Sequence, residues 1–321
     1  MITLIVPTRN RAHTLSLIGE SFYRLELVNE IIFVNDAGTD DTAAVVGEIA
    51  RRHPHVSTRI LNNEHRLGAS GSRIKGYEAA ANDYILYSDD DIYIEPDYAA
   101  VCLRKMRETG AGIASGRIIR KRFDQTPEAA IAAFGTGTSD KPPFRKWVCE
   151  VRGEAKTAGD VYLPLTGPVI LTTRALLREL SYDGFYSRGN GYREESDFQM
   201  HAFVTGHAIL MTNDTHCAEL SRIESKVGGQ RTARLKGLYW AVYYNAYFYR
   251  KYYDRYAALV GLKFGRRTAT ALFALYQLHA YFIRPFGYRF DKWVARQRER
   301  RAMAAQEKNR TSGRSLSQAE W

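Results

Sequence analysis

The sequence has little cysteine and no long hydrophobic run. Its three cysteines, Cys102, Cys149 and Cys217, lie far apart in 321 residues and form no CxxC pair, which argues against a disulfide framework, a redox dithiol and a structural zinc site. The first ten residues, MITLIVPTRN, have no basic start before a short apolar run, so the sequence predicts no export signal. A reducing, cytoplasmic setting is expected.

A glycine-rich phosphate loop is also missing. Dinucleotide-binding domains carry GxGxxG after their first strand, and P-loop NTPases carry GxxxxGK[ST] there. The corresponding segment of this chain, PTRNRAHT (residues 7–14), contains no glycine. A diphosphate bound here would need another neutralising group, and carboxylates that hold Mg²⁺ or Mn²⁺ are the device that the sequence offers.

The first two thirds of the chain have no excess of basic over acidic residues. Residues 222–321 contain 21 Lys and Arg against 6 Asp and Glu, whereas residues 1–221 contain 25 against 29. The formal excess of +11 therefore comes from the C-terminal third. Such an asymmetry indicates an acidic partner, meaning anionic lipid or nucleic acid, or a solvated basic tail.

What the sequence does contain is an alternation of short apolar runs and amphipathic stretches. Residues 2–8 form a β-branched run, and residues 12–26 follow with Leu15, Ile18 and Phe22 on one helical face. Four such units in about 110 residues predict an α/β fold, with a doubly wound, mostly parallel, Rossmann-like sheet and helices on both faces. The further strands are expected at 30–36, 58–63 and within 84–91, and the further helices at 41–52, 68–81 and from Pro96 onward.

Three adjacent aspartates end the run YILYSDDDI (residues 84–92). Adjacent carboxylates repel, so either a bound cation or a solvated turn that caps the next helix must offset them. Alternate residues of an extended segment share a face, which lets Asp89 and Asp91 point the same way while Asp90 turns aside. Because ligands bind at the carboxyl ends of parallel strands, the triplet is expected to share one crevice with PTRN and NDAGTDD.

Four ordered features of residues 3–93 resemble glycosyltransferase family 2. They are the strand ends VPTRNR and VNDAGTDDT, the stretch RLGASGSRIKGY, and the aspartate triplet as a DXD motif. The resemblance implies the GT-A fold, a nucleoside diphosphate sugar donor and a Mn²⁺ or Mg²⁺ cofactor. It implies that Asp36 receives the nucleobase and that the triplet contacts the ribose and the metal diphosphate. The donor-binding residues implied are Pro7, Thr8, Arg9, Asp36, Arg73, Asp89 and Asp90, and the metal ligands are Asp91, Asp89 and His216.

Two of these assignments have structural alternatives. A carboxylate such as Asp36 accepts the ring N–H of uracil or guanine, but it also suits an Asx turn in NDAG. Arg73 lies where the family usually has Ala-Arg-Asn-Xaa-Gly, whereas this chain has SRIKG. A contact to the diphosphate and a salt bridge both remain open for Arg73.

The stretch YREESDFQMH (residues 192–201) resembles the acidic motif in which a carboxylate removes a proton from the attacking hydroxyl. Glu195 is the expected base, Glu194 the second choice and Asp197 an organiser. Acids in a first helical turn also suit the helix dipole without any catalytic role. His201 stands where many relatives have arginine.

THCAELSRIESKVGGQR (residues 215–231) resembles the family stretch in which a histidine precedes Gly-Gly by about a dozen residues. His216 is therefore expected to be a third metal ligand or to touch the leaving diphosphate, with a structural histidine as the alternative. Gly228 and Gly229 would let a loop pass close to the donor.

The C-terminal region is basic and aromatic. Residues 268–283 are apolar, but they number 16 and include Gln277 and His279, which is short of the roughly 20 that span a bilayer. Helices lying on an anionic membrane, and helices packed on the catalytic domain or on a second subunit, are both compatible with this pattern.

The resemblance implies a GT-A domain over residues 1–225, with a nucleotide-binding half (1–115) and an acceptor-binding half (116–225). A helical region (226–295) and a polar tail (296–321) are expected to follow, and residues 121–160 are expected to be a long loop with little regular structure. The function that the resemblance implies is inverting transfer of a sugar, with UDP as the expected nucleotide, to a carbohydrate or lipid-linked hydroxyl in cell-surface polysaccharide or glycoconjugate synthesis. The expected setting is peripheral at the inner membrane face, with a homodimer possible and no nucleic acid. The alternative is a non-catalytic basic protein that binds nucleic acid or anionic membrane through its C-terminal third.

Overall fold

The computed structural model describes residues 1–135, 137–139, 141–153, 155–225 and 233–283. Residues Met1–Ala271 form one compact unit and Leu272–Trp321 a second. The predicted tail (296–321) and the glycine pair Gly228 and Gly229 lie outside the described residues.

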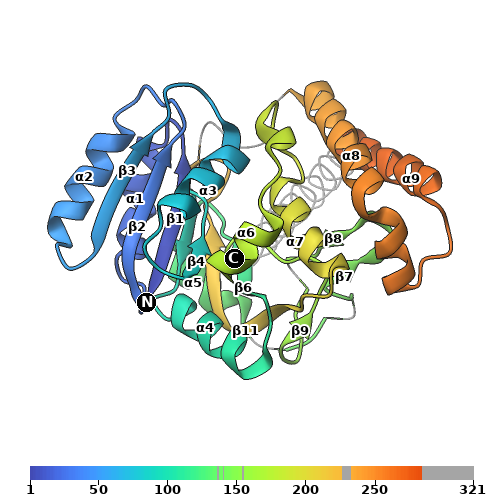
Figure 1. The fold of residues 1–321 in the computed structure, drawn as a ribbon, viewed down its shortest axis with the longest axis horizontal. Helices are drawn as coiled ribbons and strands as arrows, with labels where there is room; N and C mark the ends of the chain where they lie inside the picture. Colours follow the sequence, from blue (N-terminus) through green and yellow to red (C-terminus); the bar gives the residue numbers. More distant parts are fainter. Residues whose placement is uncertain (136, 140, 154, 226–232, 284–321) are drawn as a thin grey trace, which may run out of the picture. The chain divides into compact units, whose positions relative to one another are not determined.

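A nine-stranded mixed sheet is the framework of the first unit (Figure 1). Its strands lie in the order β3-β2-β1-β4-β10-β6-β11-β5, and β9 pairs with β11. The bounds are β1 (Ile2–Thr8), β2 (Val28–Asn35), β3 (Ser57–Asn62), β4 (Tyr84–Tyr87), β5 (Ile92–Ile94), β6 (Ile113–Arg120), β9 (Val161–Tyr162), β10 (Ile170–Thr173) and β11 (Ile209–Glu219).

The first four strands in this order are mutually parallel, which confirms the prediction for the N-terminal half. Thr8 lies opposite Asn35 and Ile5 opposite Tyr87, so the segments that follow β1, β2 and β4 meet at one sheet edge. The second half departs from the expected pattern, because β10 runs antiparallel between β4 and β6. β5 and β9 are also antiparallel to β11.

Helices cover both faces of the sheet, as predicted. Leu4 and Val6 pack into one buried cluster with residues of α1, α2 and α4, while Ile5 packs with α3, α6 and α7 on the other face. β1, β2 and β4 are buried on both sides because both sets of their alternating side chains are largely apolar, and full burial of one such side chain stabilises the fold by about 1.5–3 kcal/mol. The helices are α1 (Ala12–Phe22), α2 (Thr42–Arg52), α3 (Gly68–Ala79), α4 (Tyr98–Thr109), α6 (Arg174–Leu180) and α7 (Glu194–Val204).

The expected long loop over residues 121–160 contains short regular elements, so that prediction is corrected. α5 (Pro127–Phe134) starts where the Thr126 side chain accepts from Ala129 N–H and Pro127 occupies the first turn. A hairpin of β7 (Phe144–Arg145) and β8 (Glu150–Val151) follows, joined by the 3₁₀ helix η1 (Lys146–Val148). Local capping chemistry forms these elements without a long periodic pattern.

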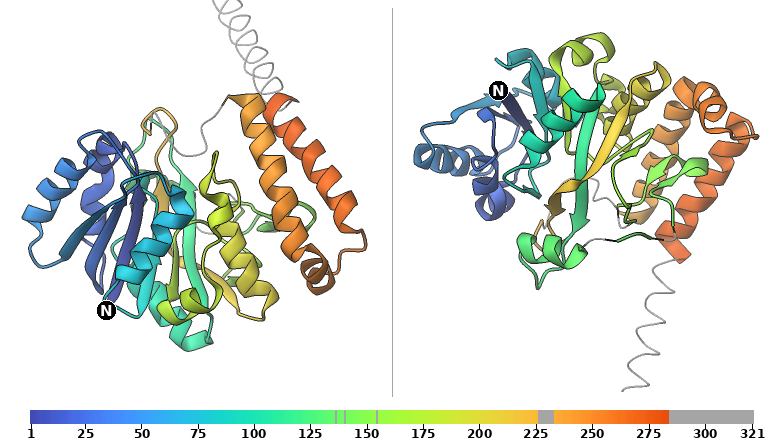
Figure 2. Two further views of the ribbon diagram at one scale, coloured as in Figure 1. Left: turned by 45° about the horizontal axis from the view of Figure 1, so that its top comes forward. Right: turned by 90° about the horizontal axis from the view of Figure 1, so that it is seen from below.

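The prediction of a helical C-terminal region (226–295) is confirmed within residues 234–283, and residues 226–232 and 284–295 lie outside the described residues. The region comprises α8 (Arg234–Val260), α9 (Arg266–Leu278) and the π-helical turn η3 (His279–Ile283). α8 packs along α7 (Figure 2). The Tyr252 ring of α8 lies against His201 of α7, and its hydroxyl donates to Asp197. Within the described ranges, none of the helices has the length and apolar character required to cross a membrane.

Candidate active site at the strand ends

The aspartate triplet follows β4 and lies beside the segment that follows β1. The Arg11 guanidinium is 3.2 Å from Asp90 Oδ1 and 3.5 Å from Asp91 Oδ2. Asp90 is 6% exposed, and burial raises its pKa to about 6 against the lowering effect of Arg11. The structure thus places Thr8 and Arg9, which act on the pKa of Asp90, beside the triplet, with Pro7 directly before them, and it adds Arg11, which lies in the quoted motif but was given no role.

Asp36 follows β2 and is bound to the start of α3. Its carboxylate accepts from Asn63 Nδ2 at 2.9 Å, from Leu67 N–H at 2.6 Å and from Gly68 N–H at 2.9 Å. A carboxylate at a helix N-terminus is favoured by the orphan N–H groups there. Asp36 thus orders the segment between β3 and α3, next to the position expected for the nucleobase.

Arg73, in α3, is the centre of the site. Its side chain is fully buried, and its guanidinium donates to Asp89 Oδ1 at 2.8 Å, to Glu195 Oε1 at 3.2 Å and to Glu194 Oε1. The rings of Tyr87 and Tyr182 lie 5.9 and 5.7 Å from the guanidinium carbon. Arg73 therefore joins α3, the aspartate triplet and the acidic turn of α7 in one cluster.

Negative charge exceeds positive charge in this cluster. Five carboxylates, those of Asp89, Asp90, Asp91, Glu194 and Glu195, share the guanidinium groups of Arg11 and Arg73. The pKa of the Asp89 carboxyl is raised to about 7, chiefly by burial. Arg73 opposes this rise, whereas the charges of Glu195 and Asp91 add to it. A local excess of oxygen anions of this kind fits a hard divalent cation.

His216 lies elsewhere on the sheet. It is on β11, opposite Glu95, whose Oε2 is 2.7 Å from His216 N and 3.0 Å from its Nδ1. The backbone carbonyl of Asp91 instead accepts from the N–H of Leu220, which directly follows β11 and is four residues beyond His216, or about 13 Å along the chain at the rise of a strand. In the part of the chain that the structure describes, no group of three or more His, Cys, Asp and Glu side chains is arranged to hold a metal ion. Asp91 lies near enough to Asp89 to raise the pKa of its carboxyl, whereas His216 lies apart, beside Glu95.

Comparison with known families decides the assignment of the N-terminal part. Residues 3–158 match the model of the family described as Glycosyl transferase family 2. They belong to this family. The family 2 segment contains β1 to β4, the aspartate triplet and Arg73, whereas α7 and α8 lie beyond it.

The curated relatives match only part of their length. Glycosyltransferase GlyA of Streptococcus pneumoniae is 34% identical over 117 residues, which are 36% of this chain and 16% of GlyA. The GalNAc(5)-diNAcBac-PP-undecaprenol beta-1,3-glucosyltransferase of Campylobacter jejuni is 25% identical over 128 residues, 40% of this chain and 41% of the relative. The matches therefore span less than half of these relatives.

Solved structures share the fold. S. aureus TarS 1-349 in complex with UDP superposes over 77% of this chain and 65% of its own, with a TM-score of 0.52 and 15% identity. GalNAc-T7 with UDP, GalNAc and Mn²⁺ superposes over 78% of this chain and 49% of its own, with a TM-score of 0.58 and 16% identity. The predicted GT-A fold is confirmed.

α7 presents its acids in two directions. Glu194, with a 5% exposed side chain, pairs with Arg73 and lies 3.3 Å from Ser70 Oγ, whereas the Glu195 side chain is 25% exposed. Asp197 instead faces α8, where it accepts from Lys251 Nζ at 2.7 Å and from the Tyr252 hydroxyl at 3.1 Å. The structure thus gathers Glu194 and Glu195 with the family 2 residues and uses Asp197 to join helices.

Several residues of the site were missed in the sequence. Ser70, Tyr87, Tyr182 and Lys251 carry no motif, and they become visible only through contacts between distant segments. Ser70 lies inside the quoted stretch RLGASGSRIKGY and Tyr87 inside YILYSDDDI, and these stretches were the available signals.

The stability of the protein is expected to fall as pH rises from about 4 to 7 through Asp89 and Asp90. Their pKa values of about 7 and about 6 exceed the roughly 3.9 of an unfolded aspartate. In that window the folded chain binds more protons than the unfolded chain, so the free energy of unfolding decreases with pH. Urea unfolding at pH 5 and pH 7.5 should show a smaller decrease for Asp89→Asn than for the wild type. Equal decreases would contradict the assignment.

Proposed function

We propose that the protein is an inverting glycosyltransferase that moves a sugar from a nucleoside diphosphate sugar to a hydroxyl acceptor. The observation that carries the proposal is the meeting of Asp89, Glu194 and Glu195 on Arg73, at the sheet edge that also holds Asp91. UDP is the nucleotide we favour, because the TarS and GalNAc-T7 structures are described with UDP. The undecaprenol-linked substrate in the name of the C. jejuni relative supports a carbohydrate or lipid-linked acceptor.

Glu195 is suited to act as the base. Its side chain is 25% exposed, so an acceptor hydroxyl can reach it, whereas Glu194 is 5% exposed and held by Arg73. In the displacement, the acceptor oxygen forms a bond to the anomeric carbon while the bond to the diphosphate breaks, and the electron pair leaves with the diphosphate oxygen. Glu195 receives the hydroxyl proton, and attack opposite the leaving group inverts the anomeric configuration.

Asp89 and Asp91 would hold a divalent cation. The donor set consists of hard carboxylate oxygens, and their excess over the two arginines provides the charge that Mn²⁺ or Mg²⁺ requires. Such a cation, when bound, neutralises the diphosphate as it departs. Arg73 supplies a second positive charge from α3. We keep His216 as a structural residue of β11, since it lies beside Glu95.

The basic C-terminal third has a separate role in this proposal. A peripheral contact with an anionic membrane, at the inner face, would bring the site to a lipid-linked acceptor of cell-surface polysaccharide or glycoconjugate synthesis. A homodimer through the same helices remains part of the proposal.

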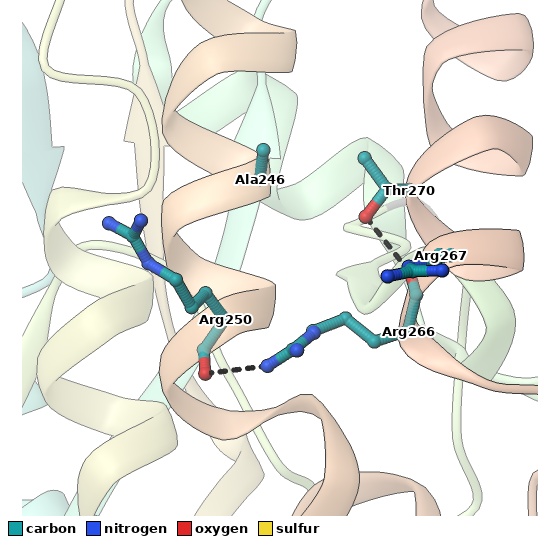
Figure 3. A pocket seen from close by; sticks show the side chains of 5 residues that line it. All are labelled: Ala246, Arg250, Arg266, Arg267 and Thr270. Atoms are coloured by element: carbon teal, nitrogen blue, oxygen red, sulfur yellow. Dashed lines mark hydrogen bonds between the residues drawn. The ribbon is translucent and has the colours of Figure 1, made fainter.

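The alternative function, in which basic side chains of the C-terminal third bind a nucleic acid or an anionic membrane, has less support from the geometry of α8 and α9. A cavity of about 370 Å³ between α8 and the start of α9 is lined by Ala246, Arg250, Arg266, Arg267 and Thr270. Figure 3 shows Arg266 reaching to the Arg250 carbonyl oxygen, at 3.2 Å, while the Arg250 guanidinium points away from it. The three guanidinium groups do not converge on one anion.

Nucleotide binding tests the proposal directly. UDP at 100 times its Kd should stabilise the protein by about 2.7 kcal/mol in the presence of Mn²⁺, which appears as a rise of several degrees in Tm. Asp91→Asn should remove the dependence on Mn²⁺, because one of two carboxylates then loses its charge. Asp254→Asn, at an exposed position of α8, serves as the control. Equal UDP affinity with and without Mn²⁺ in the wild type would refute the role of the cation.

A further inference from the structure

Four aromatic rings form a row along the outer side of α8 and the 3₁₀ helix η2 (Gly184–Ser187). In order they are Tyr239, Tyr243, Phe185 and Tyr247, and we call them the aromatic row. Successive ring centroids are 5.8, 5.7 and 3.8 Å apart, and successive planes differ by 14°, 19° and 19°. The rings are therefore nearly parallel although they come from two segments of the chain.

The aromatic row is open to solvent. Tyr239 is 58% exposed, Tyr243 42% and Phe185 37%. Two of the centroid separations exceed the roughly 3.5–4.0 Å of direct carbon contact, so these rings overlap only in part and leave portions of their faces uncovered. Trp240 packs edge-on against both Tyr239 and Tyr243, which fixes their orientation. Pre-positioned rings lose little conformational entropy when a ligand binds.

The polar groups beside the row are mostly paired. Asp183 Oδ2 accepts from the Tyr247 hydroxyl and from Lys251 Nζ, each at 2.8 Å, and Lys251 also donates to Asp197. Asp183, Asp197 and Lys251 line a cavity of about 500 Å³ together with His201 and Tyr252. Such a cavity offers hydrogen-bond donors and acceptors from several side chains, which suits a hydroxyl-rich ligand.

The segment 184–193 connects the row to the acidic turn of α7. The Tyr244 hydroxyl donates to Arg188 O, and Gly189 lies so close to Trp240 that an added Cβ would be 2.4 Å from the indole. On its other side the segment meets α3, where an added Cβ on Gly68 would be 2.8 Å from the Ser187 backbone. Glu194 and Glu195 follow directly after this segment.

We propose that the aromatic row binds the sugar rings of a carbohydrate acceptor and guides its end toward Glu195. This inference rests on the proposed function and names the class of acceptor and the residues that select it. The C–H faces of sugar rings pack on aromatic faces, while their hydroxyls bond to groups such as Asp183 and Lys251. A lipid surface or a nucleic acid would instead be bound by cations along the row. Of the two cations that lie over the Tyr247 ring, Lys251 is paired with Asp183 and Asp197, which leaves Arg250.

Titration with neutral hexasaccharides tests this inference in the full chain. Chitohexaose, cellohexaose and maltohexaose are titrated by calorimetry, with and without UDP and Mn²⁺. We expect at least one to bind, and Tyr243→Ala and Tyr239→Ala to weaken its binding about tenfold each. Tyr239→Phe keeps the ring and should bind like the wild type. Leu259→Ala, at a 60% exposed position of the same helix, should also leave the affinity unchanged.

The outcomes separate this inference from the proposed function. Failure of all three hexasaccharides to bind, or equal affinity in the wild type and both alanine variants, overturns the role of the row even if UDP binds with Mn²⁺. Binding of a single-stranded oligonucleotide that weakens in Tyr243→Ala and in high salt would also overturn it. Ring-dependent hexasaccharide binding without any UDP binding would instead remove the glycosyltransferase proposal and leave the row as a carbohydrate site.

Discussion

Glu195→Gln is expected to lower kcat for sugar transfer by a factor of about 10² to 10⁴, because the variant has no base to receive the acceptor proton. Glutamine keeps the size of the side chain and can still accept from Arg73, which lies 3.2 Å from Glu195 Oε1 in the native protein. The UDP affinity should therefore remain within a few-fold of the native value. Release of UDP from a UDP-sugar in the presence of acceptor measures kcat, and calorimetry measures UDP binding.

Two further variants locate the effect. Glu179→Gln, at an exposed position of α6 with a 62% exposed side chain, should retain full activity. Glu194→Gln should affect stability more than Glu195→Gln does, since Glu194 is the buried partner of Arg73. Retention of more than a tenth of the native kcat in Glu195→Gln would show that another group receives the proton.

Arg73→Met is expected to lower the free energy of unfolding by about 3–5 kcal/mol. The substitution leaves the 5% exposed Glu194 carboxylate buried without its cation. Removal of one partner of a buried ion pair is strongly destabilising because the remaining charge is uncompensated. Glu195, with a 25% exposed side chain, regains water more readily and adds less. Urea unfolding followed by circular dichroism gives the free energy.

A compensating variant distinguishes loss of charge balance from loss of packing. Arg73→Met combined with Glu194→Leu removes both members of the buried pair and should recover part of the stability. Arg104→Met, in an exposed ion pair of α4, should change the free energy of unfolding by less than about 0.5 kcal/mol. A loss below 1 kcal/mol for Arg73→Met would mean that water or a rearranged side chain replaces the guanidinium.

The N-terminal half of the fold was accessible from the sequence because its signals are local. Apolar β-branched runs such as residues 2–8, followed by one-sided helical patterns, suffice to predict parallel strands with helices on both faces. The antiparallel insertion of β10 was not accessible, because ILTT (residues 170–173) has no local feature that records its direction or its neighbours. Strand pairing of this kind depends on contacts across the whole domain.

The candidate site could also be predicted from the sequence only where its signals are local. Asp89, Asp91, Glu194 and Glu195 stand out as acidic clusters in the sequence. The ion pair that joins them does not, because Arg73 and Glu194 are 121 residues apart. His216 shows the opposite error: its spacing to the glycine pair resembles the family, but the register of β11 places it beside Glu95 rather than Asp91.

The bridge from Lys251 to Asp197 and Asp183 has a consequence for how this protein is divided or recombined. Removal of the chain after residue 225 would strip Asp197, whose side chain is 2% exposed, of its ammonium partner while the carboxylate stays enclosed. Burial already raises the pKa of Asp197, and Lys251 counteracts that effect. α8 (Arg234–Val260) thus stabilises α7, the helix that carries Glu194 and Glu195. A chimaera of two homologues should therefore take both helices from the same parent.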